Sequence, residues 1–330
     1  MSTIAQLAAS ISLTAADYRT AELGPFTAGH VIMWVNQFDP EERLPVLDEL
    51  NHVLKRTYLT EANMEEFLIK VAANQKFVGA DAKAFWKSVG VLRVQTGGNS
   101  QNEMLERLER ILNEHIGIGL DECRSTSGTF LYIDDAVFSG NRVKNDLEPW
   151  IENVAPQTFS LRIVVGALHT NGKNYADEHL KKIASSVGKT ITTNWWQVMG
   201  FENQKFRKNS SEVLWPSELP PDVQVSQYVE TLKTAGFPPV LRVPGETPKD
   251  GVFSGEVGRA TLERALLRAG VRVRSICTNL RENSRPLGFT PLKTLGFGTT
   301  VVTFRNCPNN APLAFWAGSP WYPLFRRKTN

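Results

Sequence analysis

The chain has 330 residues, of which 42% are hydrophobic and 22% are charged. That composition is typical of a globular chain with a sizeable core, and it excludes collagen, coiled coil and wholesale disorder. No run of about 18 apolar residues is present, so no membrane-spanning helix is predicted. Residues 1–13 lack the cationic start and long apolar stretch of a secretory signal. Three widely separated cysteines, Cys123, Cys277 and Cys307, have no metal-ligand spacing, so we expect inert thiols in a reduced, cytoplasmic compartment.

The formal net charge of +3 is unevenly distributed along the chain. Residues 256–330 contain twelve Lys and Arg against three Glu, a balance of +9, which leaves −6 for residues 1–255. A basic C-terminal quarter predicts an anionic partner, either phosphate or nucleic acid. The alternative is that these charges form a solvated face.

Residues 1–88 are predicted to be a small helical domain. Leucines recur at helical spacing in residues 44–54, after Asp39 as the expected N-cap and Pro40 at the first turn. Apolar residues follow the i, i+3, i+4, i+7 pattern in residues 64–71, with Thr60 as the expected cap, and residues 30–38 form a third helix. A helical module of this kind is typical of docking on a partner or on a second domain.

Strands and helices alternate from residue 89 onward. Strands are predicted at residues 91–94, 130–133 and 161–168, each followed by an amphipathic helix. This alternation predicts an α/β domain, residues 89–330, with a parallel sheet and helices on both of its faces. The nearly continuous apolar run of residues 161–168 indicates a strand that is buried on both faces.

A proline-rich stretch interrupts the alternation. Seven of the eighteen prolines lie between residues 216 and 248, so we expect an insertion at about residues 205–255, beside the sheet. A helix is predicted from residue 256 to residue 269, ended by Gly270, and residues 299–304 are predicted to be β-structure.

Residues 130–143 are the most informative segment. The strand is followed by Asp134 and Asp135, and then by a small loop with Ser139 and Gly140 that leads into a helix. Ligands of open parallel sheets bind at the carboxyl ends of the strands, so both carboxylates are expected at an open strand end. There they can accept hydrogen bonds from sugar hydroxyls or hold Mg²⁺. The N–H groups and dipole of the following helix form an anion site, which Gly140 allows the backbone to approach. The alternative is that these residues only cap the loop and the helix.

This segment resembles the phosphoribosyl-pyrophosphate (PRPP) motif of type I phosphoribosyltransferases: an apolar strand, paired acids, two apolar residues and a small loop. The resemblance implies that Asp134 and Asp135 bind the ribose hydroxyls. It implies that the 5-phosphate is bound by Ser139, Gly140, Asn141 and Arg142. It also implies a pyrophosphate loop made of Thr96, Gly97, Gly98, Asn99 and Ser100, where the glycine pair permits close backbone approach. Mg²⁺ would neutralise the pyrophosphate group.

A narrower resemblance covers residues 30–325. Residues 34–38, 93–100, 305–312 and 321–325, together with the acid pair, are similar to phosphoribosyltransferase-like effectors of bacterial conflict systems. Some of these effectors are encoded beside retron reverse transcriptases in phage defence. The resemblance implies PRPP or a nucleotide as ligand. The partner it implies is nucleic acid or a reverse-transcriptase complex with RNA and DNA.

Two departures from the transferase pattern keep two functions open. Phe138 stands where many of these transferases carry an acid, and Arg142 stands where many carry Thr. The short stretch between residues 115 and 130 leaves little room for a mobile hood loop, which argues against ordinary nucleotide salvage.

One hypothesis is an effector enzyme that acts on PRPP, a nucleotide or a nucleoside at the anomeric carbon. The other is a non-catalytic module that senses such a ligand or docks on a nucleic-acid complex. A third interpretation, a Mg²⁺ nuclease, needs another carboxylate that the sequence does not place.

Other polar and aromatic residues are weaker candidates, each with a structural alternative. His169 ends a strand but is better explained as a core histidine. Trp195 and Trp196 are a candidate pair for base stacking, with a core ring as the alternative. For Asn309 and Asn310 the alternative is a turn, and for Arg264 and Arg268 it is a solvated helix face.

Overall fold

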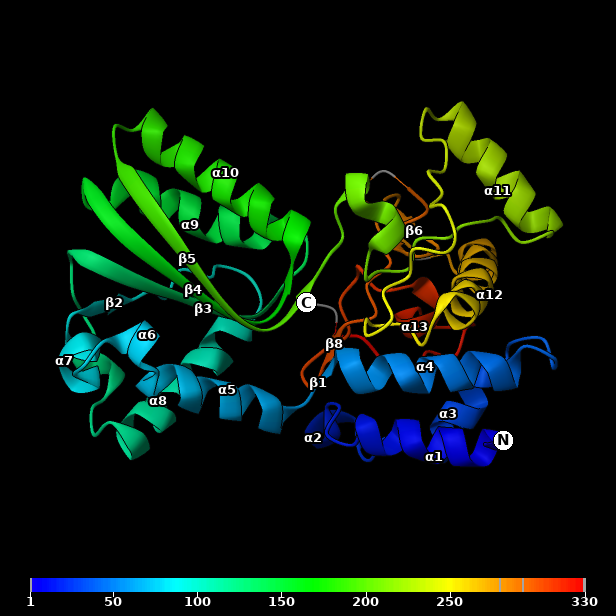
Figure 1. The fold of residues 1–330 in the computed structure, drawn as a ribbon, viewed down its shortest axis with the longest axis horizontal. Coiled ribbons are helices and arrows are strands. Elements are labelled where there is room, and N and C mark those ends of the chain that lie inside the picture. The colour runs from blue at the N-terminus through cyan, green and yellow to red at the C-terminus, as the bar shows by residue number, and fades with distance from the viewer. Residues whose placement is uncertain (1, 279, 293, 329–330) are drawn as a thin grey trace. The chain divides into compact units, whose positions relative to one another are not determined.

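The computed structural model describes residues 2–278, 280–292 and 294–328. The chain divides into two compact units, Met1–Thr60 together with Glu202–Asn330, and Glu61–Phe201 (Figure 1). These units do not follow the expected boundary at residue 88, because residues 61–88 belong with the sheet. The proline-rich stretch belongs to the unit that contains both ends of the chain. Local periodicity shows that a helix has an apolar face, but it does not show what that face packs against.

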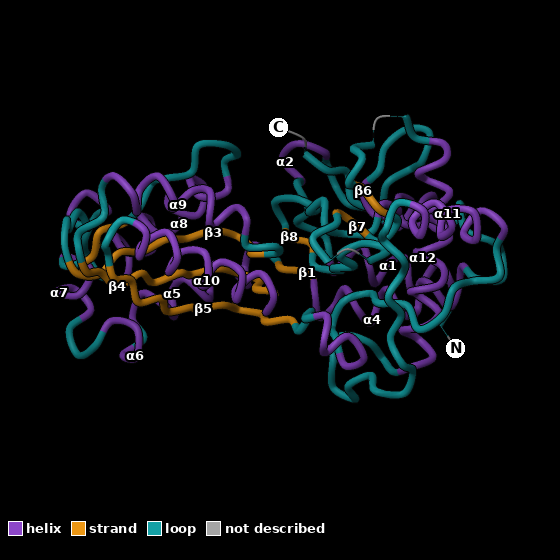
Figure 2. Tube along the Cα trace, turned by 90° about the horizontal axis from the view of Figure 1, so that it is seen from above, coloured by secondary structure: helices purple, strands orange, loops and turns teal. Residues whose placement is uncertain are grey.

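The unit Glu61–Phe201 is built on a parallel sheet, which confirms the predicted α/β class. Its strands are β2 (Val89–Val91), β3 (Gly128–Val137), β4 (Thr158–His169) and β5 (Thr190–Phe201), in the order β2-β3-β4-β5. Helices α9 (Asn141–Asn153) and α10 (Thr170–Ser186) cover one face. Helices α5 (Glu61–Ala73) and α8 (Ser100–His115) cover the other face, below the sheet in Figure 1. Figure 2 shows β3, β4 and β5 running side by side. The short helices α6 (Gln75–Val78) and α7 (Ala82–Lys87) and the 3₁₀ turn η1 (Leu120–Glu122) complete the unit.

The core of this unit follows the alternation of side chains along the strands. Phe130 and Tyr132 of β3 pack with Leu161 and Ile163 of β4 and with Leu147 of α9. Strand β4 is buried without interruption from residue 163 to residue 169, which confirms that it is covered on both faces.

The other unit is mainly helical. Its helices are α1 (Ile4–Thr14), α2 (Thr20–Leu23), α3 (Ala28–Val35), α4 (Arg43–Thr57), α11 (Val223–Thr234), α12 (Glu256–Ile276) and α13 (Leu313–Trp316), with the 3₁₀ segment η2 (Lys205–Ser210). Strand β1 (Tyr58–Leu59) pairs with β8 (Val302–Thr303), and β6 (Ser284–Arg285) pairs with β7 (Gly288–Phe289). The expected β-structure at residues 299–304 is therefore limited to the two residues of β8.

Segments 34–38 and 321–325 meet in the core of this helical unit. The indole Nε1 of Trp34 donates to the carbonyl of Ala314 at 2.7 Å. Gln37 and Tyr322 exchange two hydrogen bonds of 2.8 Å between the Gln37 amide and the Tyr322 backbone. These residues join α3 to the C-terminal segment, so their role in this unit is structural.

A buried ion network fixes the proline-rich stretch to α12. Glu263 lies between the guanidinium groups of Arg242, at 2.9 Å, and Arg259, at 2.8 Å, and all three side chains are buried. Burial raises the pKa of Glu263 and outweighs the two arginines, which lower it. Since Arg242 comes from the proline-rich stretch, its ion pair with Glu263 anchors that stretch to α12.

Gly270 does not end the helix that precedes it. Helix α12 continues to Ile276, and a β-carbon on Gly270 would lie 2.6 Å from the Cα of Pro286. The glycine is therefore required by close backbone packing, a contact that local sequence does not reveal.

We expect Gly270→Ala to destabilise the protein by about 1–3 kcal/mol, because overpacking against Pro286 outweighs the better helix propensity of alanine. Gly29→Ala in α3 is the matched control, since its β-carbon would meet only Thr27 Oγ1, at 3.8 Å. The control should raise stability by up to about 1 kcal/mol. Urea unfolding measures both values, and equal effects would contradict the packing explanation.

Candidate functional site

Three connections leave the carboxyl edge of the parallel sheet side by side. Residues 92–99 link β2 to α8, residues 138–140 link β3 to α9, and α10 begins directly after β4. Because the strands are parallel and adjacent, these connections lie at one edge, where ligands of open α/β sheets bind.

The two aspartates differ in their environment. Strand β3 continues to Val137, so both acids lie within the strand and not beyond its end. Asp134 is only 3% exposed, whereas Asp135 is half-buried. The backbone N–H of Asp135 donates to Asp134 Oδ1 at 2.9 Å. The expectation that both carboxylates are open is therefore wrong for Asp134, because alternate residues of a strand face opposite sides and this one faces inward.

Asp146 of α9 connects the acids of β3 to Arg142. The hydroxyl of Tyr132 lies 2.9 Å from Asp146 Oδ2 and 3.4 Å from Asp134 Oδ2, and it has one proton to donate. Arg142 Nη1 lies 3.5 Å from Asp146 Oδ1. Burial raises the pKa of Asp146, although hydrogen bonds from Tyr132, Arg142 and Gln95 lower it.

The structure brings the expected pyrophosphate loop to the expected 5-phosphate loop. A β-carbon placed on Gly97 would lie 3.7 Å from Nη1 of Arg142. The loop is held by the side chain of Gln101, whose Oε1 accepts the N–H groups of Val94, at 2.8 Å, and Gln95, at 2.9 Å. Of these sequence-predicted residues, Gly97 and Arg142 are thus neighbours in space.

Gln95, Gln101 and Asp146 are site residues that the sequence analysis missed. Gln101 and Asp146 are fully or almost fully buried, although each is polar and lies on the apolar side of its helix. A polar residue in the apolar phase of an amphipathic helix is the signal that could have identified them.

Gly140 is required by the packing of its own loop. Its φ of +79° is the left-handed conformation, and a β-carbon there would meet the carbonyl oxygen of Gly172, with Tyr175 Cδ1 at 3.1 Å. In turn, a β-carbon on Gly172 would lie 2.9 Å from the carbonyl carbon of Phe138. The β3–α9 loop therefore packs directly on the first turn of α10, and it is this contact that requires glycine.

The start of α9 remains accessible. Asn141 is exposed, Ser139 is half-buried, and the side chain of Arg142 is 49% exposed. The Ser139 hydroxyl accepts the N–H of Asn141 at 3.4 Å. A positive side chain, a hydroxyl and the first turn of a helix thus stand together, as in anion sites at helix N-termini.

His169 is a core residue, as its structural alternative proposed. Its ring centroid lies 5.3 Å from those of both Phe138 and Phe201, and the residue is fully buried. Burial lowers its pKa to about 3, partly offset by a hydrogen bond to the backbone of Val137. The imidazole is therefore neutral at physiological pH.

The two tryptophans lie on opposite faces of β5. Trp195 Nε1 donates to Asp177 Oδ1 at 2.8 Å and its ring packs against the core under α9 and α10. Trp196 packs edge-on against Phe77, with ring centroids 5.1 Å apart. Both rings are thus used within the fold.

The two candidate arginines of α12, Arg264 and Arg268, are paired with acids of their own unit. Arg264 lies 3.3 Å from Glu218, and Arg268 lies 2.7 Å from Asp39 and 3.2 Å from Glu42. Part of the basic charge of the C-terminal quarter is therefore satisfied internally. Asn310 is buried in the same unit, at 7% exposure, and Asn309 is half-buried.

Two negative findings apply to residues 2–278, 280–292 and 294–328. They contain no group of three His, Cys, Asp or Glu side chains that could hold a metal ion. Their helices include none with the length and apolarity needed to cross a membrane.

A parallel sheet with an acid pair, a glycine loop and a helix N-terminus at one edge defines an α/β protein of the phosphoribosyltransferase-like class. The model of one family, described as PRTase-CE, matches residues 31–327. The chain therefore belongs to the PRTase-CE family, which is phosphoribosyltransferase-like. Comparisons with curated proteins and with solved structures give no match.

We expect Gly140→Ala to cost about 2–4 kcal/mol of stability, because it adds left-handed strain and a clash with Gly172. Gly97→Ala in the neighbouring loop is the control, since its β-carbon has room beside Arg142. The free energy of unfolding of this control should stay within about 0.5 kcal/mol of that of the original protein. A stable, well-folded Gly140→Ala protein in thermal unfolding would contradict this role.

His169→Phe should flatten the acid dependence of stability. The pKa of this histidine rises from about 3 in the folded state to its ordinary 6.5 on unfolding, so protons favour the unfolded chain. The contribution of neutral His169 to the free energy of unfolding is complete above pH 6.5. It is lost as the pH falls toward 3, at about 1.4 kcal/mol per pH unit. Urea unfolding of both proteins between pH 4 and pH 8 measures the difference. Parallel profiles would show that His169 does not titrate in this way.

Proposed function

We propose that the carboxyl edge of the sheet binds the ribose 5-phosphate part of PRPP, a nucleotide or a nucleoside, and that the protein acts at the anomeric carbon. The observation that carries this proposal is the meeting of three elements. Gly97 of the β2–α8 loop lies beside Arg142 of α9, and Arg142 is joined through Asp146 and Tyr132 to Asp134 of β3.

The 5-phosphate is assigned to the start of α9. The first turn of a helix has N–H groups without an intrahelical acceptor, and its dipole favours an anion. Arg142 adds a full charge, and Ser139 adds a hydroxyl. Because Asp146 restrains the guanidinium of Arg142, less side-chain freedom is lost when a phosphate binds.

The ribose hydroxyls are assigned to Asp135. This carboxylate is half-buried, so it has both an accessible edge and a reduced dielectric around it. Asp134 acts as a positioning residue, because it is buried and holds the backbone of Asp135 through the 2.9 Å hydrogen bond. This division replaces the equal roles that the sequence implied for the two acids.

The pyrophosphate group is assigned to residues 96–100. Gly98 has a φ of +89° and Gly97 carries no side chain, so the backbone can approach an anion closely. The described acids include no trio that could build a metal site, so a Mg²⁺ ion would depend on ligand oxygens as much as on protein. When bound, Mg²⁺ would neutralise the pyrophosphate leaving group.

Chemistry at the anomeric carbon passes through an oxocarbenium-like centre, which the protein can favour by position and charge. Holding the sugar through Asp135 and the phosphate through α9 fixes that carbon between two anchors. Asp135 also places negative charge on the ribose side of the site, where positive charge develops.

A sensing role is the second candidate, and Phe138 favours it. The phenyl ring of Phe138 packs on His169, at 5.3 Å, at the position where many transferases carry an acid. Without that acid, ligand binding is retained more easily than group transfer. For both candidates, the enzyme and the sensing module, we propose an effector role in bacterial phage defence, with a reverse-transcriptase or nucleic-acid complex as partner. The sequence resemblance supports this role.

Calorimetric titration with ribose 5-phosphate tests the site. Asp135→Asn should weaken binding by about tenfold, because a charge-assisted hydrogen bond is lost, and should leave the unfolding temperature unchanged. Asp121→Asn, at an exposed acid of η1, is the control and should bind normally. Asp134→Asn should lower stability, because this side chain is buried in the fold. Unchanged binding by Asp135→Asn would remove the ribose assignment.

Turnover separates the two candidate functions. Incubation with PRPP or a nucleoside 5′-monophosphate in water, followed by phosphorus NMR, should show ribose 5-phosphate if the protein hydrolyses the anomeric bond, together with pyrophosphate when PRPP is the substrate. Binding without release would assign the sensing role.

A further inference from the structure

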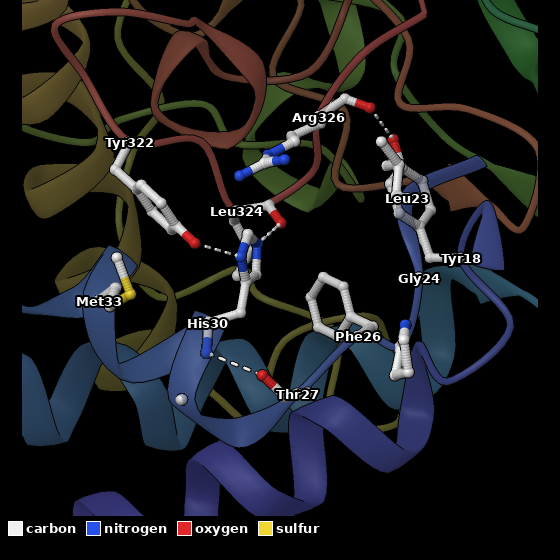
Figure 3. A pocket seen from close by; sticks show the side chains of 12 residues that line it. Tyr18, Leu23, Gly24, Phe26, Thr27, His30, Met33, Tyr322, Leu324 and Arg326 are labelled. Carbon is white, nitrogen blue, oxygen red and sulfur yellow. Dashed lines mark hydrogen bonds between the residues drawn. The ribbon is translucent and has the colours of Figure 1, made fainter.

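A cavity lies in the helical unit, and none of the residues assigned above is among those that line it. It has a volume of about 500 Å³ and lies between the segment that joins α2 to α3, helix α3 itself and the C-terminal residues 322–326 (Figure 3). Small-molecule sites typically measure about 300–1,000 Å³, so this cavity is large enough for an organic ligand.

The wall of this cavity is held rigidly by His30. Its Nε2 lies 2.6 Å from the carbonyl oxygen of Leu324, which can only accept, so Nε2 carries the proton and donates. Its Nδ1, 2.7 Å away, therefore accepts the hydroxyl proton of Tyr322. Burial lowers the pKa of His30, which agrees with a neutral ring. Both ring nitrogens of His30 and the hydroxyl of Tyr322 thus have hydrogen-bond partners within the protein, and both residues line the cavity.

Aromatic and apolar side chains form the rest of the wall. Phe26 lies with its ring stacked on Phe325, with centroids 5.4 Å apart and planes at 12°. Met33 lines the cavity as well and is 54% exposed. Flat and polarisable surfaces of this kind suit a planar apolar body.

Among the described residues that line the cavity, Arg326 carries the one full charge, and none is Asp or Glu. Within the described part of the chain, the side chain of Arg326 has no carboxylate partner, whereas its backbone carbonyl is anchored by the Tyr18 hydroxyl at 2.9 Å. Figure 3 shows this side chain reaching across the cavity from the C-terminal segment. Arg326 is exposed, so its charge is available to an anion that enters the cavity beside the aromatic walls.

We propose that this cavity binds a small, flat organic anion with a single negative group. Its carboxylate or equivalent group pairs with the fork of Arg326, and its planar body lies against the rings of Phe26, His30 and Tyr322. One guanidinium matches one carboxylate in a two-bond geometry, so a singly charged ligand fits the cavity best.

Fluorescence titration with 2-naphthoate tests the proposal, with the neutral 2-naphthamide as the matched probe. The original protein should bind one 2-naphthoate. Arg326→Gln should weaken that binding by about tenfold or more and leave 2-naphthamide binding within about twofold, because only the charge pair is lost. Arg207→Gln, at an exposed arginine of η2 that does not line the cavity, is the control and should change neither.

A variant whose new side chain fills the cavity tests whether 2-naphthoate binds there. Gly29 lines it, and a β-carbon there would meet only Thr27 Oγ1, at 3.8 Å, so Gly29→Leu adds a side chain without backbone strain. It should abolish binding of 2-naphthoate without lowering the unfolding temperature. Failure of the original protein to bind 2-naphthoate, or equal binding by Arg326→Gln or Gly29→Leu, would overturn the proposal. Asp135→Asn should bind 2-naphthoate normally, so the failure of this proposal is distinguishable from that of the phosphoribosyl site.

Discussion

The contact between Gly140 and Gly172 is the constraint on which the candidate site depends. Neither position has room for a β-carbon, because each would meet backbone of the opposite segment. The β3–α9 loop and the first turn of α10 can therefore approach to backbone contact. That approach fixes where α9 begins, and with it the direction of its first-turn N–H groups and the location of Arg142. The phosphate assignment thus rests on a packing contact between two glycines, neither of which needs to touch the ligand.

Near that contact, buried polar side chains hold the accessible groups of the site in position. Asp134, Asp146 and Gln101 are buried, and each holds a neighbour: the backbone of Asp135, the guanidinium of Arg142 and the β2–α8 loop, respectively. Burial of a polar group is costly unless its hydrogen bonds are made, so the bonds from Asp134, Asp146 and Gln101 Oε1 favour one arrangement of the site. Asp135 and Arg142, which retain exposure, are left to meet a ligand.

In the helical unit, too, a buried charged group is held by its partners. Glu263 is buried between Arg242 and Arg259, where removal of one partner would leave a charge uncompensated. The network fixes the proline-rich stretch to α12, because Arg242 comes from that stretch and Glu263 and Arg259 come from the helix. Arg326 is the contrasting case, because it lines a cavity without a carboxylate beside it.

The sequence by itself determined the class of the sheet and the main candidates for binding. The apolar run of β4 predicts burial on both faces, and the alternation of strands and helices predicts a parallel sheet, because these patterns reflect local burial. Strand β5 was missed, since it is an edge strand whose residues are mostly half-buried or exposed and give no strong alternation. The motif at residues 130–143 could be read because its acids, loop and helix start are close in the chain.

Only the tertiary structure decided how these parts are used. It assigned residues 61–88 to the sheet, separated buried Asp134 from half-buried Asp135, and brought Gly97 to Arg142. It also showed that Gly140 and Gly270 are glycines because of backbone from distant segments. Each of these outcomes depends on contacts between residues far apart in the chain. Periodicity and spacing report what a residue prefers locally, whereas the partner that meets it across the fold is set by packing.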